Sequence, residues 1–210
     1  MLILCIEKIL GREMSYRHSN AENIMKKIVI LLGSPRKNGN SERLAKSFAT
    51  GAESQGAQAR FFRLHNMNIK GCSDCRQCWS KGKHCIVADD MSQLYESIDN
   101  ADVVVFATPL YWYSWSAQIK AVWDRMLPYV SDKAKTTVKG KQSVLLVTAG
   151  DEREDVFDAV LESFDRSASL LGLKLAGKIC AHNVYDIGDI EEGNWLDQAK
   201  ELGASVGKVN

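Results

Sequence analysis

The sequence has little of what would mark a specialised partner or environment. Its 210 residues carry a formal net charge of only +1, so no basic excess points to nucleic acid as a partner. No apolar run reaches the roughly 18–20 residues of a membrane-spanning helix, so we expect no membrane partner either. Internal repeats and low-complexity segments are also lacking. The 45% of hydrophobic residues is enough for the core of one ordinary globular domain.

The first residues lack the features of a secretion signal. Residues 1–10 are apolar, but Glu7 and Lys8 interrupt the stretch, and it has neither a basic start nor a small-residue cleavage site. We therefore expect residues 1–25 to be an extension, either disordered or helical, before a single domain of residues 26–210. Four of the six cysteines crowd into residues 72–85, which is untypical of a secreted protein and favours a reducing, cytoplasmic setting.

An unbroken apolar run at residues 28–32, rich in β-branched side chains, predicts a first strand that is buried on both faces. Gly33 and Pro35 end the strand, and Asn40 or Ser41 is placed to cap the helix that follows. The loop between them matches neither G-x-G-x-x-G nor G-x-x-x-x-G-K-[ST]. A dinucleotide-binding loop and a nucleoside-triphosphate loop are therefore both unsupported.

The same loop and the helix N-terminus together predict a cradle for an anion such as phosphate, because both present unpaired backbone N–H groups. The side chains that add donors or positive charge are Ser34, Arg36, Asn38, Asn40 and Ser41. The alternative is an ordinary strand–helix turn with good caps. The local pattern alone does not separate the two.

Four further strands are predicted, in alternation with helices. The strands are expected at residues 59–64, 102–107, 143–148 and 173–179. The helical stripes run over residues 44–52, 91–98, 119–126, 157–171 and 195–206. Gly172 is placed to stop the fourth of these helices. This alternation predicts an open α/β fold, a doubly wound parallel sheet with helices on both faces. In such a sheet the loops after the first, third and fourth strands meet at one crevice.

The loop after the third strand, residues 108–116, holds four aromatic rings within five residues. Exposed rings on a loop need a contact, and a flat aromatic ligand would supply one through stacking. The alternative for Trp112 or Trp115 is packing under the adjacent helix or in a dimer interface. Trp115, nearest the helix, is the ring that we expect to be structural. After the fourth strand, Ala149 and Gly150 would let the backbone approach a ring closely.

Three stretches together resemble the flavodoxin-like family of FMN reductases and iron–sulfur flavoproteins. They are Gly33–Ser41, Thr108–Trp112, and Lys120 with Asp124-Arg125 on the next helix. The resemblance implies a five-stranded sheet in the order 2-1-3-4-5, an FMN cofactor, and a homodimer or homotetramer. It places the FMN phosphate at Ser34, Arg36, Asn40 and Ser41. It places the ring at Pro109, Leu110, Tyr111 and Trp112, with Ala149 and Gly150 alongside.

The remaining motif is a group of cysteines, Cys72, Cys75, Cys78 and Cys85, which lie within 14 residues after the second strand. The close C-x2-C-x2-C start suits a [4Fe–4S] cluster, and the iron–sulfur flavoproteins carry a similar compact motif. The alternatives are zinc, for which His84 could replace a cysteine, and free thiols or a redox disulfide. Because the second strand should neighbour the first, we expect the cysteines at the same edge of the sheet as the flavin crevice.

These features predict an FMN-dependent oxidoreductase. NAD(P)H or a reduced carrier such as ferredoxin would deliver electrons, and a quinone, a flavin or another small acceptor would receive them, with or without the cluster. No catalytic acid or base is expected among the side chains, since the flavin N5 accepts hydride. The alternatives are a non-enzymatic electron-transfer flavoprotein linked to ferredoxin, and a regulatory flavoprotein of the tryptophan-repressor-binding kind.

Overall fold

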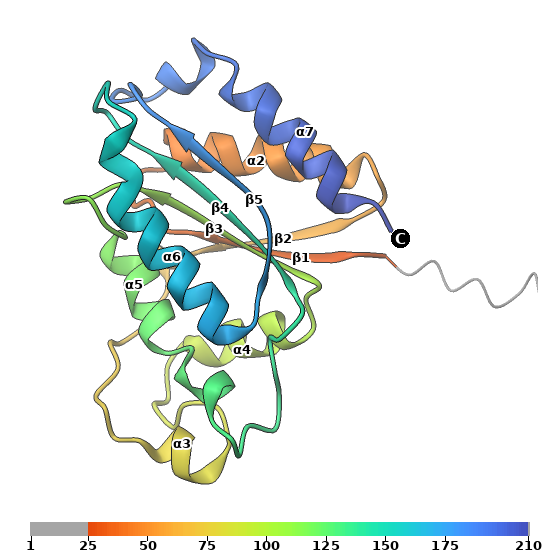
Figure 1. Cartoon of the computed structure of the whole chain (residues 1–210), viewed down its shortest axis with the longest axis vertical. Helices are drawn as coiled ribbons and strands as arrows, with labels where there is room; N and C mark the ends of the chain where they lie inside the picture. Colours follow the sequence, from red (N-terminus) through yellow and green to blue (C-terminus); the bar gives the residue numbers. More distant parts are fainter. Residues whose placement is uncertain (1–24, 210) are drawn as a thin grey trace, which may run out of the picture.

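The computed structural model describes residues 25–209, which form a parallel sheet in the order β2-β1-β3-β4-β5 (Figure 1). This confirms the predicted doubly wound fold. Every neighbouring pair of strands is parallel, so all five carboxyl ends lie at one edge of the sheet. The strands are β1 (Lys27–Leu32), β2 (Gln58–Arg63), β3 (Val103–Pro109), β4 (Gln142–Thr148) and β5 (Lys174–Ala181). The predicted extension lies, apart from Met25, outside the described residues.

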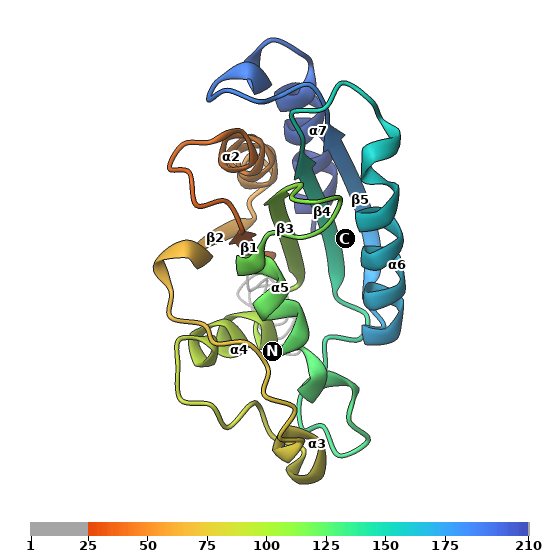
Figure 2. The same ribbon diagram turned by 90° about the vertical axis from the view of Figure 1, so that its left-hand side faces the viewer.

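Helices cover both faces of the sheet, as predicted (Figure 1, Figure 2). One face carries α2 (Asn40–Glu53) and α7 (Trp195–Gly207). The other carries α4 (Met91–Asp99), α5 (Ala117–Asp124) and α6 (Asp158–Leu171). A short helix, α3 (Gln77–Lys81), interrupts the long connection from β2 to α4. The 3-10 turns are η1 (Leu64–Asn66), η2 (Leu127–Val130), η3 (Asp155–Phe157) and η4 (Asp189–Glu191). Within residues 25–209 no helix has both the length and the apolar character to span a bilayer.

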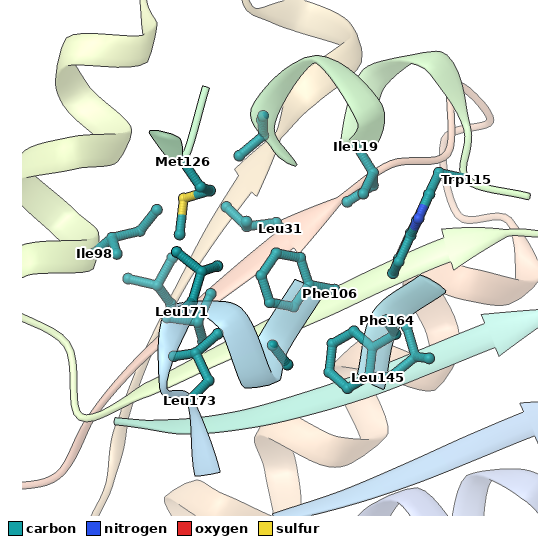
Figure 3. Close-up of a cluster of buried hydrophobic side chains, with 14 of the residues drawn as sticks. Leu31, Ile98, Phe106, Trp115, Ile119, Met126, Leu145, Phe164, Leu171 and Leu173 are labelled. Carbon is teal, nitrogen blue, oxygen red and sulfur yellow. The ribbon is translucent and has the colours of Figure 1, made fainter. Parts of the chain in front are cut away.

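The central strand β3 shows why the apolar runs fold as they do. Its alternate side chains point to opposite faces, so Val105 packs in the core under α2 and α7, while Phe106 packs in the core under α4, α5 and α6. Figure 3 shows Phe106 within the core under α4, α5 and α6, close to Trp115 and Phe164. Trp115 is only 7% exposed, which confirms the expectation that this ring is structural.

Helices α2 and α7 pack backbone against backbone. A Cβ atom on Gly51 would lie 1.9 Å from the Lys200 carbonyl oxygen, and one on Gly203 would lie 1.9 Å from that of Phe48. Only glycine permits so close an approach at these two points. The position of α7 therefore fixes that of α2, and with it the loop that leads into α2.

The start of α2 differs from the prediction. Gly39, not Asn40 or Ser41, occupies the N-cap position, and no side chain within residues 25–209 caps the helix. Asn40 and Ser41 lie within the first turn, where their side chains are available for other partners. Because the first N–H groups of a helix have no intrahelical acceptor, the uncapped end leaves donors open for a ligand.

Candidate functional site

Four loops meet at the carboxyl end of the sheet and enclose an open crevice of about 230 Å³. They follow β1, β3, β4 and β5, so the predicted meeting of the first three is observed. The lining residues are Ser34, Arg36, Asn40, Ser41, Pro109, Leu110, Tyr111, Thr148, Ala149, Gly150, Val184 and Tyr185. The crevice lies where the strand order changes direction, the usual place for a ligand in such a sheet. A hollow of about 340 Å³ between β1, β2 and α4 is larger, so size alone does not identify the site.

The loop after β1 is tied to the loop after β5. Arg36 Nη1 donates a hydrogen bond to the Tyr185 carbonyl oxygen at 3.0 Å, and Asn40 Nδ2 donates to that of Asp186 at 2.8 Å. The Gly188 N–H donates back to Asn40 Oδ1 at 3.1 Å. These bonds hold Arg36 and Asn40 at the wall of the crevice. The bond from Arg36 uses one of the five N–H donors of a guanidinium, which leaves the others for an anion.

Two serines complete the polar half of the crevice. Ser34 Oγ accepts a hydrogen bond from the Arg36 N–H at 3.2 Å, which shapes the turn after β1. Ser41 Oγ lies 2.7 Å from Thr148 Oγ1, and both groups are buried. This contact joins the first turn of α2 to the end of β4. Hydroxyl groups, an arginine and an uncapped helix N-terminus thus surround one end of the crevice, an arrangement that favours an anion.

Asn38 belongs to the predicted set but does not line the crevice. Its backbone is left-handed, with φ at +56°. Its N–H donates to Glu42 Oε2 at 2.6 Å, and its Oδ1 accepts a hydrogen bond from Lys46 Nζ at 3.2 Å. Both groups are therefore engaged with side chains of α2. Asn38 therefore supports the loop from outside the lining of the crevice, and its contact with a ligand stays a prediction.

Glu42 supports the loop of this site through Asn38, a role that the sequence reasoning missed. Its side chain is 5% exposed and forms ion pairs with Arg63 at 2.5 Å and Lys46 at 3.0 Å. Burial alone would raise the pKa of Glu42, but hydrogen bonds from Arg63, Lys46 and the Asn38 N–H hold it below its ordinary value. A signal was present, because Glu42 stands three residues after the N-cap Gly39, the spacing of a capping box.

The aromatic loop after β3 divides into buried and exposed parts. Tyr111 and Ser114 exchange both backbone hydrogen bonds at 3.0 Å, which closes a two-residue turn. The turn residues, Trp112 and Tyr113, have φ of +49° and +59°, a conformation that costs energy in residues other than glycine. Trp112 is 95% exposed and does not line the crevice, whereas Pro109, Leu110 and Tyr111 do.

The sequence reasoning also missed three lining residues, Thr148, Val184 and Tyr185. Val184 and Tyr185 belong to the loop after β5, which the prediction left out of the crevice. A Cβ atom on Gly150 would lie 2.7 Å from Tyr185 Cδ2, so the loops after β4 and β5 pack closely here. The available signal was topological, since the carboxyl end of β5 had to share the edge with those of its neighbours.

The cysteine segment, defined as residues 71–88, lies far from the crevice (Figure 1, Figure 2). Its helix α3 rests on the chain after η2, where Ser131 Oγ donates to the Trp79 carbonyl oxygen at 2.9 Å. His84 Nε2 lies 3.2 Å from Asp99 Oδ2, at the end of α4 that leads into the start of β3. The expectation that the cysteines share the edge of the crevice was therefore wrong. After β2 the chain runs back past α4 and α5 toward the amino ends of the strands.

The four thiols of this segment differ in exposure. Cys72 and Cys75 are exposed, Cys85 is half-buried and Cys78 is buried. Burial raises the pKa of the Cys78 thiol, and the charges of Cys85, Cys72 and Cys75 raise it further. Within residues 25–209, however, no group of three or more metal-binding side chains is already assembled. The donor set fits a thiolate-bound metal group by its chemistry, although the described arrangement is open.

The sequence model of NADPH-dependent FMN reductases matches residues 26–159 of this chain. The chain belongs to the NADPH-dependent FMN reductase family. This FMN reductase homologue is 30% identical to an iron–sulfur flavoprotein from Archaeoglobus fulgidus over 186 residues, which are 87% of this chain and 80% of that protein. It is 32% identical to an iron–sulfur flavoprotein from Methanosarcina thermophila over 99 residues, 47% of this chain and 51% of that protein.

Solved structures support the fold of this FMN reductase homologue. The NAD(P)H:quinone oxidoreductase from Methanothermobacter marburgensis matches it with a TM-score of 0.71 and 18% identity, over 89% of this chain and 98% of that one. An FMN-dependent NADH-azoreductase from Bacillus anthracis, solved in complex with FMN, matches with a TM-score of 0.63 and 14% identity, over 87% of this chain and 100% of that one. The resemblance drawn from the sequence is thereby confirmed at the level of the family and the fold.

Proposed function

We propose that this chain binds FMN in the crevice and uses it to pass electrons from NAD(P)H to a small acceptor such as a quinone or a flavin. The observation that carries the proposal is the uncapped N-terminus of α2, which opens on the crevice beside Arg36, Ser34 and Ser41. Backbone N–H groups, two hydroxyls and a guanidinium suit the phosphate of FMN, which would be held at this end.

The other half of the crevice suits the ring. Pro109, Leu110 and Tyr111 form one side of it, and Ala149 and Gly150 form another, so apolar groups and a backbone without a Cβ would hold the flat ring. When bound, FMN supplies hydride acceptance and both one- and two-electron transfer. Among the residues that the structure describes, no carboxylate, histidine, lysine or cysteine lines the crevice, which supports a role of these side chains in binding and orientation.

Two exposed aromatic rings beside the crevice support the proposal that the substrate is flat. Trp112 and Tyr113, 95% and 53% exposed, stand at the tip of the turn that Tyr111 begins. We propose that they contact a nicotinamide or a planar acceptor, or the surface of a second copy in a homodimer or homotetramer. Size-exclusion chromatography with light scattering separates these uses. A monomer in solution would exclude the second.

We propose a [4Fe–4S] cluster on Cys72, Cys75, Cys78 and Cys85. The spacing of the four thiols in the sequence and the naming of the relatives as iron–sulfur flavoproteins support it. Zinc and free thiols are the outcomes that would contradict it. With a cluster present, a relay of electrons from a ferredoxin-type donor becomes the second candidate function, because a cluster transfers single electrons. The crowded cysteines also support a reducing, cytoplasmic setting.

The experiment is an anaerobic purification followed by titration with FMN. We expect a yellow complex with quenched flavin fluorescence, and oxidation of NADH or NADPH that depends on added quinone. A folded protein that takes up no FMN would overturn the proposal. Negligible turnover with NAD(P)H, together with fast reduction by ferredoxin, would favour the relay. Iron and acid-labile sulfide, measured in parallel, decide the cluster independently of the flavin.

A further inference from the structure

The cysteine segment is closed at its base by a compact neck, formed by residues 68–70 on one side and residues 87–90 on the other. The Asp90 N–H donates to the Asn68 carbonyl oxygen at 3.1 Å, and the Asn68 N–H donates to Asp90 Oδ2 at 2.7 Å. The Lys70 N–H donates to Asp89 Oδ2 at 2.9 Å. The two sides are therefore bonded to each other directly, and all four cysteines lie in the loop between them.

Arg125 reaches this neck from another element, because it follows α5 directly. Its side chain is 1% exposed and that of Asp89 is 0% exposed. Arg125 Nη1 donates to Asp89 Oδ2 at 2.5 Å and to the Lys70 carbonyl oxygen at 3.2 Å. Nη2 donates to the Val87 carbonyl oxygen at 3.5 Å. One guanidinium thus bridges both sides of the neck from outside the cysteine segment.

The same guanidinium lies beside one of the cysteines. Burial alone would lower the pKa of Arg125, but the bonded Asp89 and the neighbouring Cys85 thiol raise it. The Nε atom is buried and has no hydrogen-bond partner among the described residues. An apolar side chain would fill this space at no desolvation cost, but it could not join carbonyl groups on both sides of the neck. Packing alone therefore does not explain why a guanidinium, that of Arg125, occupies this place.

We infer that Arg125 is the positioning residue of the cysteine segment, a clamp that fixes the neck from α5 and thereby keeps Cys78 and Cys85 in their sheltered places. The inference rests on the proposed role of the four thiols as ligands of one metal group. A fixed neck already restricts the chain before the metal group binds. The chain therefore loses less conformational entropy when four thiolates wrap that group. It also gives a role to the arginine of the Asp124-Arg125 pair, which is absent from the crevice.

The first test needs no metal. The metal-free, reduced protein is treated with iodoacetamide, and the alkylation rate of each cysteine is followed by mass spectrometry. In the Arg125→Gln variant we expect Cys78 and Cys85 to react at least about tenfold faster, because the neck opens locally. Cys180 in β5, partly buried and away from the segment, should keep its rate. Arg125→Lys keeps the charge without the fork and should give an intermediate acceleration.

The control for a general loss of stability is Glu42→Gln, which breaks a buried ion pair near the crevice and should leave the rates of Cys78 and Cys85 unchanged. Unchanged rates in Arg125→Gln would overturn the inference, and so would a parallel acceleration of Cys180, which would show that the whole fold loosens. If Arg125→Gln does not fold, Arg125→Lys is judged by the same two criteria.

The second test uses iron and sulfide. After anaerobic reconstitution with ferrous iron and sulfide, we expect Arg125→Gln to lose iron to a chelator at least about tenfold faster than the unsubstituted protein. Its affinity for FMN, measured by fluorescence, should stay the same. Equal rates of iron loss would overturn the inference. If the unsubstituted protein takes up no iron, the proposed cluster fails, while the alkylation test still decides whether Arg125 fixes the neck.

Discussion

The clearest prediction concerns Glu42, because a nearly isosteric change removes its charge and little else. Glu42→Gln keeps an oxygen that can accept the hydrogen bond from the Asn38 N–H, but it abolishes the ion pairs with Arg63 and Lys46. The change therefore tests whether a buried charge holds the loop that carries the proposed phosphate site. The size of the effect follows from how exposed each partner is.

Lys46 is 53% exposed, and its pair with Glu42 spans one helical turn, so this pair contributes only about 0.3–0.5 kcal/mol. Arg63 is 22% exposed against a carboxylate that is 5% exposed, and a charged hydrogen bond of this kind contributes about 1.5–2 kcal/mol. We therefore expect Glu42→Gln to lower the free energy of unfolding by about 2 kcal/mol at pH 7. For a domain of this size that lowers the Tm by about 4–8 °C.

The dependence of stability on pH tests whether the charge of Glu42 causes the effect. Because the folded protein holds the pKa of Glu42 below its ordinary value of 4.5, the contribution is complete above pH 4.5 and is lost as the pH falls through the lowered pKa. The difference in stability between the original protein and Glu42→Gln should therefore be constant from pH 7 to pH 5 and shrink in more acidic solution. Urea unfolding followed by circular dichroism at several pH values measures it.

The matched control is Glu53→Gln in the last turn of the same helix, where the side chain is exposed. This change should move the stability by less than about 0.5 kcal/mol. A Glu42→Gln variant as stable as the control would refute the reasoning about the buried pair. A difference that stays the same down to pH 3 would show that the effect is not due to the charge.

Four further changes test other parts of the structure. Arg36→Ala should weaken FMN binding by about 1–3 kcal/mol in a fluorescence titration, from the loss of a charge-assisted contact, and an unchanged affinity would show that Arg36 does not touch the phosphate. Gly203→Ala places a Cβ 1.9 Å from a carbonyl oxygen and should lower the free energy of unfolding by about 1–3 kcal/mol; equal stability would contradict the close packing of α2 on α7. Trp112→Asn suits the left-handed turn better and should raise stability by about 0.5–1 kcal/mol, a gain that should be absent if Trp112 is packed against a second copy. Cys75→Ser should abolish the uptake of iron and sulfide while FMN still binds, and the loss of both would mean that the cysteine segment supports the fold.

The sheet could be predicted from sequence because its strands are buried by helices on both faces. Such strands read as apolar runs, and every predicted strand lies within two residues of the observed one. Some helix ends could also be predicted. Gly172, a residue type that commonly ends helices, has φ at +68° and ends α6 as expected. The loops after β1, β3 and β4 meet at the crevice because the strand order leaves them no other place.

The parts that escaped prediction depend on contacts between distant segments. The cysteine segment is held by contacts with Ser131 and Asp99 and by the proposed clamp of Arg125. These contacts join residues far apart in the chain, so no local pattern predicts them. Tyr185 enters the crevice because a loop of the last crossover folds over the loop after β1. Glu42 has the spacing of a capping box from Gly39, but its burial against Arg63 depends on a contact with β2 that the local sequence does not show.

The separation of the crevice from the cysteine segment has a kinetic consequence. Within one chain the proposed flavin site lies at the carboxyl edge of the sheet, whereas the cysteine segment with α3 lies beyond α4 and α5 (Figure 1), and electron tunnelling slows steeply with distance. A second copy that brought its cysteine segment to the crevice would shorten this path. In that case, mixing a mutant that cannot hold flavin with a mutant stripped of its thiols should restore an exchange that neither preparation shows alone.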